Sequence, residues 1–216
     1  MDRFLDFSAD EIGVAAAAGW LRSGGLLIYP TETFYALGCD PRRADAVAAL
    51  RRLKGRSEAK ALPLLAGSLE QVGQAAPGWR RWPRARRWAE SFWPGPLSLV
   101  LDGSVLLAAG VRAADGSVAL RWTSNGIAAA LALELGYPVV ATSANAAGAP
   151  ACDRPARALE ALGSGPLAVL DGGVSPGGAP STLVDPRRDP PRLIRSGALD
   201  PSRLGLAAGD AHSFPG

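Results

Sequence analysis

The sequence predicts a single α/β domain in which short buried strands alternate with helices. The first observation is the alternation itself, because apolar segments of strand length and helix length follow one another along the 216 residues. The second is composition: hydrophobic residues make up 48% of the chain, a normal share for a globular protein and too large for a disordered one. The third is that polar segments stand directly after predicted strands, where α/β proteins place their sites.

The elements can be taken in chain order. Residues 10–22 form an alanine-rich predicted helix that ends before the Gly24-Gly25 pair, and residues 25–29 form a buried strand ended by Pro30. Residues 43–54 are predicted to be helical, with Gly55 as the stop signal. Ser68 and Gln71 have capping-box spacing for a short helix. A further helix is predicted at 125–135, and further strands at 62–66, 97–101, 117–122, 138–142, 167–171, 181–184 and 192–195.

Residues 1–200 are therefore predicted to form one domain, and residues 201–216 a poorly ordered tail. No apolar run reaches the length of a membrane span, and the acidic, mixed N-terminal residues do not read as a signal peptide, so a cytoplasmic protein is expected. Two cysteines, Cys39 and Cys152, and one histidine, His212, argue against a disulfide framework and against a Cys/His zinc site. We expect both cysteines to be small buried hydrophobic residues.

Three polar segments are candidates for a site. Residues 30–33 (PTET) and 143–145 (SAN) each follow a predicted strand, and residues 54–56 (KGR) end a predicted helix, with Lys60 close behind. Lysine and arginine in a glycine-containing loop suit a polyphosphate or a carboxylate. Each segment also has a structural interpretation, as a helix C-cap, a turn or an N-cap. Their order along one chain, not any one of them alone, indicates a function.

The segments continue a longer series of motifs. The series comprises GGLLIYPTETFYALG at 24–38, KGR at 54–56, LPLL at 62–65, FWPGPL at 92–97, VALR at 118–121, ATSAN at 141–145, STLVD at 181–185 and IRSG at 194–197. In order and spacing this series resembles the YrdC-like threonylcarbamoyl-adenylate synthases over about residues 10–200. The resemblance implies an open, twisted, mostly β sheet flanked by helices, with a basic concave cleft, in the short single-domain form.

The resemblance also implies roles for individual residues. Positions that hold ATP in similar enzymes are matched by Arg56, Lys60, Ser117, Ser143 and Arg195. Positions that hold threonine are matched by Thr33, Arg121 and Ser181. Lys54, Arg56, Ser143 and Asn145 match the Lys-x-Arg and Ser-x-Asn pairs that mark the catalytic cleft. For Glu32, the roles of general base, structural residue and ligand to metal-bound water stay open.

The implied reaction joins L-threonine, bicarbonate and ATP into threonylcarbamoyl-AMP and pyrophosphate, for the tRNA threonylcarbamoyladenosine modification next to the anticodon. The substrate supplies the attacking group, so no protein nucleophile is required, only positioning and neutralisation of charge by Lys, Arg, hydroxyls and Mg²⁺. No metal site of the protein's own is expected, because Mg²⁺ enters with ATP. The resemblance implies hand-over of the product to a threonylcarbamoyl-transferase complex and leaves direct contact with tRNA open.

Three positions depart from the family pattern. Ala36 stands where glycine is common, Ser98 stands where threonine is usual, and residues 122–125 (WTSN) replace the customary proline after Arg121. The departure beside Arg121 bears most directly on how the substrate fits.

Two other functions compete with the synthase. One is a non-catalytic RNA-binding or ribosome-assembly protein of the same fold, and the other is a carbamoyl-adenylate former with a different acceptor, as in hydrogenase-maturation proteins. Retention of both residue pairs favours the enzyme, since RNA binding needs charge but not this constellation. The basic and aromatic residues 79–88 suggest an RNA contact or, alternatively, an amphipathic helix whose tryptophans pack inward.

Overall fold

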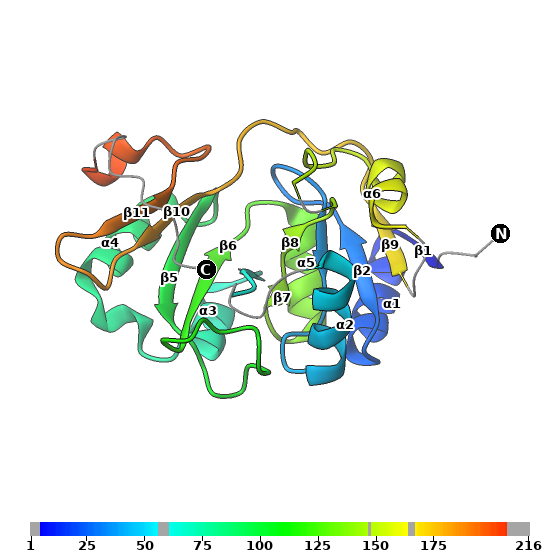
Figure 1. The fold of residues 1–216 in the computed structure, drawn as a ribbon, viewed down its shortest axis with the longest axis horizontal. Coiled ribbons are helices and arrows are strands. Elements are labelled where there is room, and N and C mark those ends of the chain that lie inside the picture. The colour runs from blue at the N-terminus through cyan, green and yellow to red at the C-terminus, as the bar shows by residue number, and fades with distance from the viewer. Residues whose placement is uncertain (1–4, 56–60, 147, 164–166, 207–216) are drawn as a thin grey trace.

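Two mixed β-sheets stand side by side, each covered by helices (Figure 1). The structure is a computed structural model that describes residues 5–55, 61–146, 148–163 and 167–206. The predicted α/β class is confirmed. The resemblance implies a single sheet, but the structure has a five-stranded and a six-stranded sheet. The chain crosses from one sheet to the other several times, so consecutive strands do not all pair in one sheet.

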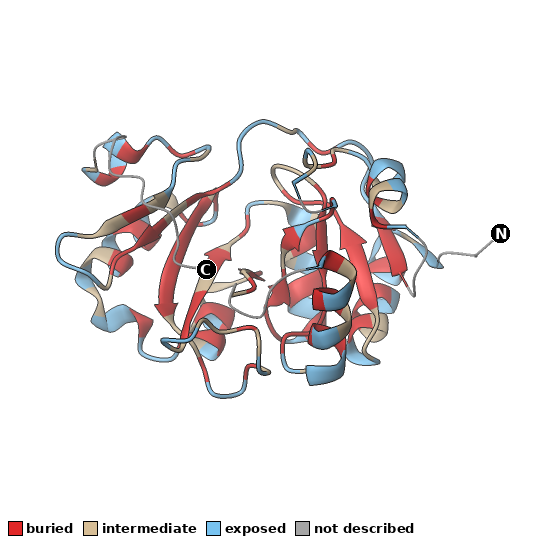
Figure 2. Ribbon diagram, viewed as in Figure 1, coloured by how far each residue is buried: buried red, intermediate tan, exposed pale blue. Residues whose placement is uncertain are grey.

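The five-stranded sheet has the order β1 (Leu5–Ser8), β9 (Leu167–Asp171), β2 (Leu26–Tyr29), β3 (Ala36–Gly38) and β8 (Thr142–Ser143). The first three strands are parallel, and β3 and β8 join antiparallel. Helices α1 (Glu11–Arg22) and α5 (Gly126–Leu135) pack together against one face of this sheet. Helices α2 (Ala44–Lys54) and α6 (Pro155–Leu162) contact β2 and join the other core. The inner strands β9, β2 and β3 are therefore largely buried on both faces, as Figure 2 shows, whereas the edge strand β1 is mostly exposed.

The six-stranded sheet has the order β11 (Arg192–Arg195), β10 (Thr182–Asp185), β5 (Leu97–Asp102), β6 (Ser117–Trp122), β4 (Leu64–Ala66) and β7 (Val139–Val140). Leucines and valines on one face of its strands pack with α3 (Leu69–Ala75) and α4 (Pro83–Phe92) in the larger core. Side chains alternate between the faces of a strand, so Ser98, Ala119 and Leu183 lie on the opposite face.

The two sheets meet where one chain segment changes sheet. β7 pairs with β4 of the six-stranded sheet, and β8, two residues on, pairs with β3 of the five-stranded sheet. Sequence analysis predicted one strand over 138–142, but Ala141 lies between two short strands and donates its N–H to the Pro63 carbonyl at 2.8 Å. This change of sheet places Ser143 directly beside the junction.

Local signals account for most helix ends. Asp10 accepts a hydrogen bond from the Gly13 N–H at the start of α1, and Asn125 accepts one from the Ala128 N–H at the start of α5. Gly55 ends α2 with a left-handed φ of 55°, as predicted. Ser68 caps α3, whereas the Gln71 side chain bonds Gly67 and not the cap residue of a capping box.

The basic and aromatic stretch forms the short η1 (Trp79–Arg81) followed by α4. Trp79 and Trp88 are buried in the larger core, while Arg80, Arg86 and Arg87 are exposed. The amphipathic interpretation of this stretch is thus confirmed for its tryptophans.

Three elements were not predicted, namely β1, β3 and α6. β1 and β3 are short, and their side chains show no clear alternation of polar and apolar residues. Residues 201–204 lie inside the segment predicted to be a poorly ordered tail, yet they form η2 (Pro201–Leu204) with Leu204 buried. Residues 207–216 lie outside the described part of the chain.

The close approach of β3 to β7 generates a stability prediction for Gly38→Ala. A Cβ on Gly38 would lie 2.3 Å from the Val140 carbonyl oxygen, a backbone atom that moves only with the sheet junction. We expect the variant to lose about 1–3 kcal/mol of unfolding free energy, the usual cost of overpacking. Urea denaturation measures this loss.

Gly19→Ala is the matched control, because a Cβ there meets no atom within 4 Å and alanine favours a helix. The control should be neutral or gain about 0.5–1 kcal/mol. Equal urea midpoints for Gly38→Ala and the unmodified chain would show that the sheet junction accommodates a methyl group at residue 38, which would contradict the prediction.

Candidate functional site

An ion pair between the two sheets forms the first part of the site. Arg121, near the end of β6, donates from Nη1 to Glu32 Oε1 at 3.0 Å, and Glu32 lies in the loop after β2. Both side chains are largely buried, with 10% and 13% of their surface exposed. Thr123 donates its hydroxyl to the other Glu32 oxygen at 2.7 Å. Both carboxylate oxygens of Glu32 are therefore engaged, which favours the structural role among the three left open.

A second arginine lies beside this pair. Arg195, at the end of β11, donates from Nη2 to the Ser181 hydroxyl at 3.0 Å and to the Ser181 carbonyl at 2.8 Å. The hydroxyls of Ser181 and Ser98 are 2.9 Å apart. Desolvation lowers the pKa of Arg195, and the positive charge of Arg121 lowers it further. The strand register places Arg195 and Arg121 on the same face of the six-stranded sheet, so two positive charges there favour binding of an anion.

Lys54 forms the centre of the next cluster, at the C-terminal end of α2. Its side chain is 8% exposed, and its ammonium group donates to the Ser143 carbonyl at 2.8 Å and to Asn145 Oδ1 at 3.0 Å. It also donates to the Asn145 carbonyl. The Ser143 hydroxyl donates to Asn145 Oδ1 at 2.6 Å. The predicted Lys54, Ser143 and Asn145 are therefore brought together, with Lys54 holding the loop after β8.

Thr33 lies in the loop that carries Glu32. Its carbonyl accepts a hydrogen bond from the Gly177 N–H at 2.7 Å, and its hydroxyl is 3.3 Å from that of Thr31. Gly177 belongs to the long connection from β9 to β10, which crosses above both sheets in Figure 1. The crossing connection and the loop that carries Glu32 thus support each other.

Ser117 stands apart from these clusters. It begins β6, four residues before Arg121 on the same face, so the two lie about 13 Å apart at roughly 3.3 Å per residue. Its hydroxyl donates to Asp115 at 2.6 Å, and Arg187 binds Asp115 at 3.0 Å. Burial alone would raise the pKa of Asp115, but the hydrogen bonds from Ser117 and the charge of Arg187 outweigh it and lower that pKa to about 2. Arg56 and Lys60 lie outside the described residues.

The departures from the family pattern have structural explanations. The methyl group of Ala36 packs in the smaller core with the residues of α1 and α5. Trp122 donates its indole N–H to the Gly67 carbonyl at 2.9 Å, Thr123 binds Glu32, and Asn125 caps α5. Ser98 keeps the hydroxyl that contacts Ser181.

Thr123 is the site residue that sequence reasoning missed. A signal for it was available, because Thr123 follows the strand β6 just as Thr31 follows β2. Polar residues directly after strands were already the pattern that identified the other candidates.

Little in the described residues suggests a metal centre or a protein nucleophile. Among them, no group of three His, Cys, Asp or Glu side chains converges to hold a metal. Cys39 and Cys152 are buried as predicted, and desolvation raises the pKa of both thiols, which opposes thiolate formation. No helix in the described ranges combines the length and the apolar character needed to cross a bilayer. The arrangement can bind and orient anions.

Comparison with known proteins gives concordant matches. The Sua5_yciO_yrdC family, described as "Telomere recombination", matches residues 19–197. A protein named threonylcarbamoyl-AMP synthase from Halorhodospira halophila is 42% identical over 149 residues, covering 68% of this chain and 73% of the relative. A protein of the same name from Thiobacillus denitrificans is 38% identical over 170 residues, covering 77% of this chain and 87% of the relative.

Solved structures of proteins named Sua5 and YciO are also similar to this chain. The crystal structure of P. abyssi Sua5 complexed with L-threonine has a TM-score of 0.86 and 30% identity, and the match covers 99% of this chain. This chain spans only 63% of that longer protein. E. coli YciO has a TM-score of 0.82 at 24% identity, covering 94% of this chain and 100% of YciO, a likeness of fold.

The Asp115 contacts generate a prediction on acid stability. Because the pKa of Asp115 is lowered from 3.8 to about 2 in the folded protein, its stabilising contribution is complete above about pH 4 and is lost as the pH falls towards 2. In Asp115→Asn, the free energy of unfolding should therefore decrease less steeply as the pH is lowered over this range. Urea denaturation at a series of pH values measures it.

The exposed Asp6→Asn is the control and should keep the original pH dependence. An unchanged slope in Asp115→Asn would mean that Arg187 and Ser117 do not favour the ionised carboxylate.

Proposed function

The chain belongs to the Sua5_yciO_yrdC family, and from this premise we propose that it is an L-threonylcarbamoyladenylate synthase. The proposed reaction consumes L-threonine, bicarbonate and ATP and releases threonylcarbamoyl-AMP and pyrophosphate. The observation that carries the proposal is the convergence of Arg121 and Arg195 with the Ser181 hydroxyl on one face of the six-stranded sheet. Such a site suits substrates that are all anions or carry a carboxylate.

Thr33, Arg121 and Ser181 are proposed to hold threonine. The guanidinium of Arg121 matches the geometry of a carboxylate, and Glu32 fixes its orientation from behind at 3.0 Å. The Ser181 hydroxyl, already bonded to Arg195 and Ser98, supplies a directed polar contact. Thr33 closes the group from the loop that Gly177 supports.

Arg56, Lys60, Ser117, Ser143 and Arg195 are proposed to hold ATP. Ser117 and Arg121 share a face of β6 about 13 Å apart, a separation that an extended nucleotide triphosphate can follow. Arg195 lies beside Arg121, so it can meet the phosphates next to the threonine carboxylate. Ser143 offers its hydroxyl from the loop that Lys54 holds.

The chemistry then needs positioning more than reactive side chains. The threonine nitrogen attacks the carbon of bicarbonate or of the carbon dioxide formed from it, and loss of water leaves a carbamate. A carbamate oxygen attacks the α-phosphorus of ATP, the bond to the bridging oxygen breaks, and pyrophosphate leaves. Arg56, Ser143 and Asn145 are proposed to neutralise and orient the reacting groups, with Lys54 acting through its three bonds to residues 143–145.

Mg²⁺ is proposed to enter as part of the MgATP substrate. Mg²⁺ keeps several of its waters and binds readily to substrate phosphates, so the phosphates of ATP and water can supply most of its ligands. We further propose that the reaction takes place in the cytoplasm, and that the adenylate passes to a threonylcarbamoyl-transferase complex, which transfers the threonylcarbamoyl group to tRNA and releases AMP. This transfer does not require the chain itself to bind tRNA.

The first test is pyrophosphate release by the purified protein. With MgATP and bicarbonate, we expect release only when L-threonine is added, because the carbamate of threonine is the nucleophile. Serine and glycine are the matched controls for the side chain of the acceptor. Release without any amino acid, or no release at all, would contradict the proposed reaction.

The second test asks whether Arg121 binds threonine or ATP. Arg121→Lys keeps the charge opposite Glu32 but loses the planar fork, so we expect the KM for threonine to rise about tenfold, equivalent to ~1.4 kcal/mol, with the KM for ATP nearly unchanged. Steady-state kinetics in each substrate measures both constants. Arg22→Lys, exposed beside Glu134, is the control. A selective rise in the KM for ATP would reassign Arg121 to the nucleotide.

A further inference from the structure

Arg121 uses only part of its guanidinium group within the described part of the chain. Its Nη1 donates to Glu32 Oε1 at 3.0 Å, whereas its Nε and Nη2 donate to no atom of the described residues. Only 10% of the side chain is exposed, so little water can take the place of a partner. Buried donors are costly unless they are satisfied, so this edge of Arg121 is suited to a ligand.

Two other buried carboxylates of the chain bind a guanidinium group through both oxygens. Asp40 accepts from Nε and Nη2 of Arg42 at 2.9 and 2.7 Å, and Asp185 accepts from the same two nitrogens of Arg187 at 2.9 and 3.0 Å. The side chains of both aspartates are 5% exposed. This forked geometry is the one that arginine and carboxylate groups favour, so the single contact in the site needs a cause.

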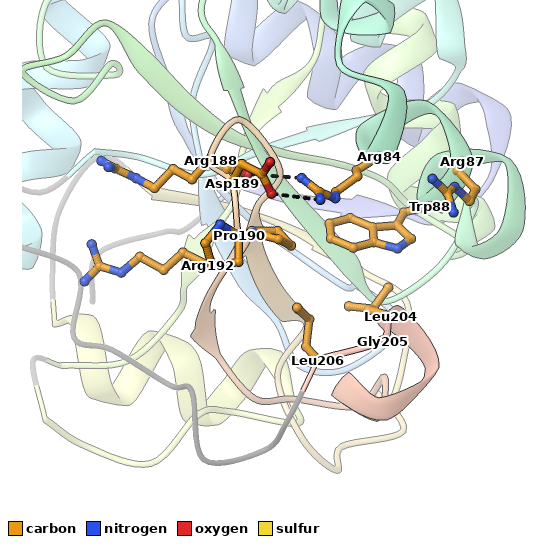
Figure 3. Close-up of a pocket in the computed structure, with 11 residues that line it drawn as sticks. Arg84, Arg87, Trp88, Arg188, Asp189, Pro190, Arg192, Leu204, Gly205 and Leu206 are labelled. Carbon is orange, nitrogen blue, oxygen red and sulfur yellow. Dashed lines mark hydrogen bonds and ion pairs between the residues drawn. The ribbon is translucent and has the colours of Figure 1, made fainter.

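Exposure is the cause in another single contact of the chain. Arg84 donates to one oxygen of Asp189 at 2.9 Å, in the groove between α4 and the turn from β10 to β11 (Figure 3). These side chains are 40% and 84% exposed, so water can satisfy the donors that the aspartate leaves free. The same explanation does not hold for Arg121, which is largely buried.

Thr123 occupies the second oxygen of Glu32. Its hydroxyl donates to Oε2 at 2.7 Å and accepts from the Asn125 N–H at 3.1 Å, so its one proton lies on the side of Glu32. The Thr123 N–H donates to the Ala66 carbonyl at 3.1 Å, and the residue is 2% exposed. The end of β4 and the start of α5 therefore fix this hydroxyl. The customary proline that residues 122–125 replace would carry no hydroxyl for such a contact.

We propose that Thr123 is a positioning residue for the amino-acid substrate. By holding Oε2, it prevents Glu32 from forming a forked pair with Arg121 and keeps Nε and Nη2 of Arg121 open for the substrate carboxylate. Without the hydroxyl, Glu32 can turn its second oxygen to Nη2 and leave the substrate a single donor. The identity of that carboxylate as threonine rests on the proposed function.

The test compares Thr123→Val, which keeps the shape and loses the hydroxyl, with Thr123→Ser, which keeps the hydroxyl. Steady-state pyrophosphate release gives the constants. We expect Thr123→Val to raise the KM for threonine about tenfold, as for one lost charge-assisted hydrogen bond, with kcat and the KM for ATP within about twofold. Thr123→Ser should stay within about twofold of the unmodified chain in all three constants. An unchanged KM for threonine in Thr123→Val would overturn the proposal.

Asn125→Ala is the control for damage at the start of α5. It removes the cap that the Asn125 side chain forms with the Ala128 N–H at 2.9 Å, and it leaves Glu32 untouched. The control should lower the urea midpoint and leave the KM for threonine unchanged. If Asn125→Ala raises this KM as much as Thr123→Val does, the effect comes from α5 and the proposal is wrong.

Glu32→Gln tests whether the effect passes through Glu32. An amide has only one acceptor oxygen and no charge, so it cannot form the competing forked pair. Adding Thr123→Val to Glu32→Gln should therefore raise the KM for threonine by less than about twofold, compared with about tenfold in the unmodified chain. The same rise in both backgrounds would show that Thr123 acts without Glu32, against the proposal.

Crystal structures of the unliganded protein and of Thr123→Val test the geometry without turnover. We expect Arg121 to bind one oxygen of Glu32 in the unmodified protein and both oxygens in the variant. A single contact in the variant would overturn the proposal, whatever its KM. If the unmodified protein releases no pyrophosphate with threonine, the proposed function fails instead, and the two structures still decide whether Thr123 holds Glu32 away from Arg121.

Discussion

The buried ion pair between Glu32 and Arg121 is the interaction that the site depends on, because it joins the two sheets at the point where the candidate residues meet. Both apolar cores contain residues from both sheets, so packing already holds the sheets together, and the ion pair adds a polar link at the point where the candidate residues meet. The pair, with Thr123 as the second donor to Glu32, ties the loop after β2 to the end of β6. Breaking a buried pair by removing one partner leaves an uncompensated charge, which costs more than the pair itself contributes. The relative position of the sheets is thus coupled to the charge state of the site.

Backbone geometry at the sheet junction completes this arrangement. The chain enters β7 in one sheet and leaves through β8 in the other, with the close approach at Gly38 allowing the Val140 carbonyl to lie against β3. The residues after β8 then fall within reach of Lys54, which gathers two carbonyls and one side-chain amide. A buried ammonium group is stable only when its donors are satisfied, so the position of α2 and the conformation of residues 143–145 support each other.

The sequence predicted the elements with strong local signals and missed relationships that depend on distant contacts. The helices capped by Asp10 and Asn125 and ended by Gly55 appear close to their predicted limits, because a cap is decided within four residues. The division into two sheets could not be predicted, since β3 has three residues and β7 only two, too few for a periodic pattern. The resemblance predicted that residues 143–145 belong with Lys54, although 89 positions separate Lys54 from Ser143. It named no partner for Glu32, so the contact of Glu32 with Arg121, over the same separation, was not predicted. The resemblance assigned an ATP-binding role to Ser117 from its position in the sequence alone. The strand β6 was predicted at that position, but the contact of the Ser117 hydroxyl with Asp115 was not.

The balance of charge within the site gives each sheet a different part in binding. On the five-stranded side, Lys54 directs its charge to oxygen atoms of residues 143 and 145, so it holds the loop that carries the Ser143 hydroxyl. On the six-stranded side, Arg121 and Arg195 repel one another, and Glu32 compensates only the first. Without Glu32, two neighbouring guanidinium groups would oppose the folded arrangement. With Glu32 present, the two arginines can lie on one face before any anion binds, and the charge of Arg195 beside Ser181 is left uncompensated by Glu32. A carboxylate or phosphate that enters there relieves the remaining repulsion, so the anion is attracted most strongly to the face on which it must be oriented.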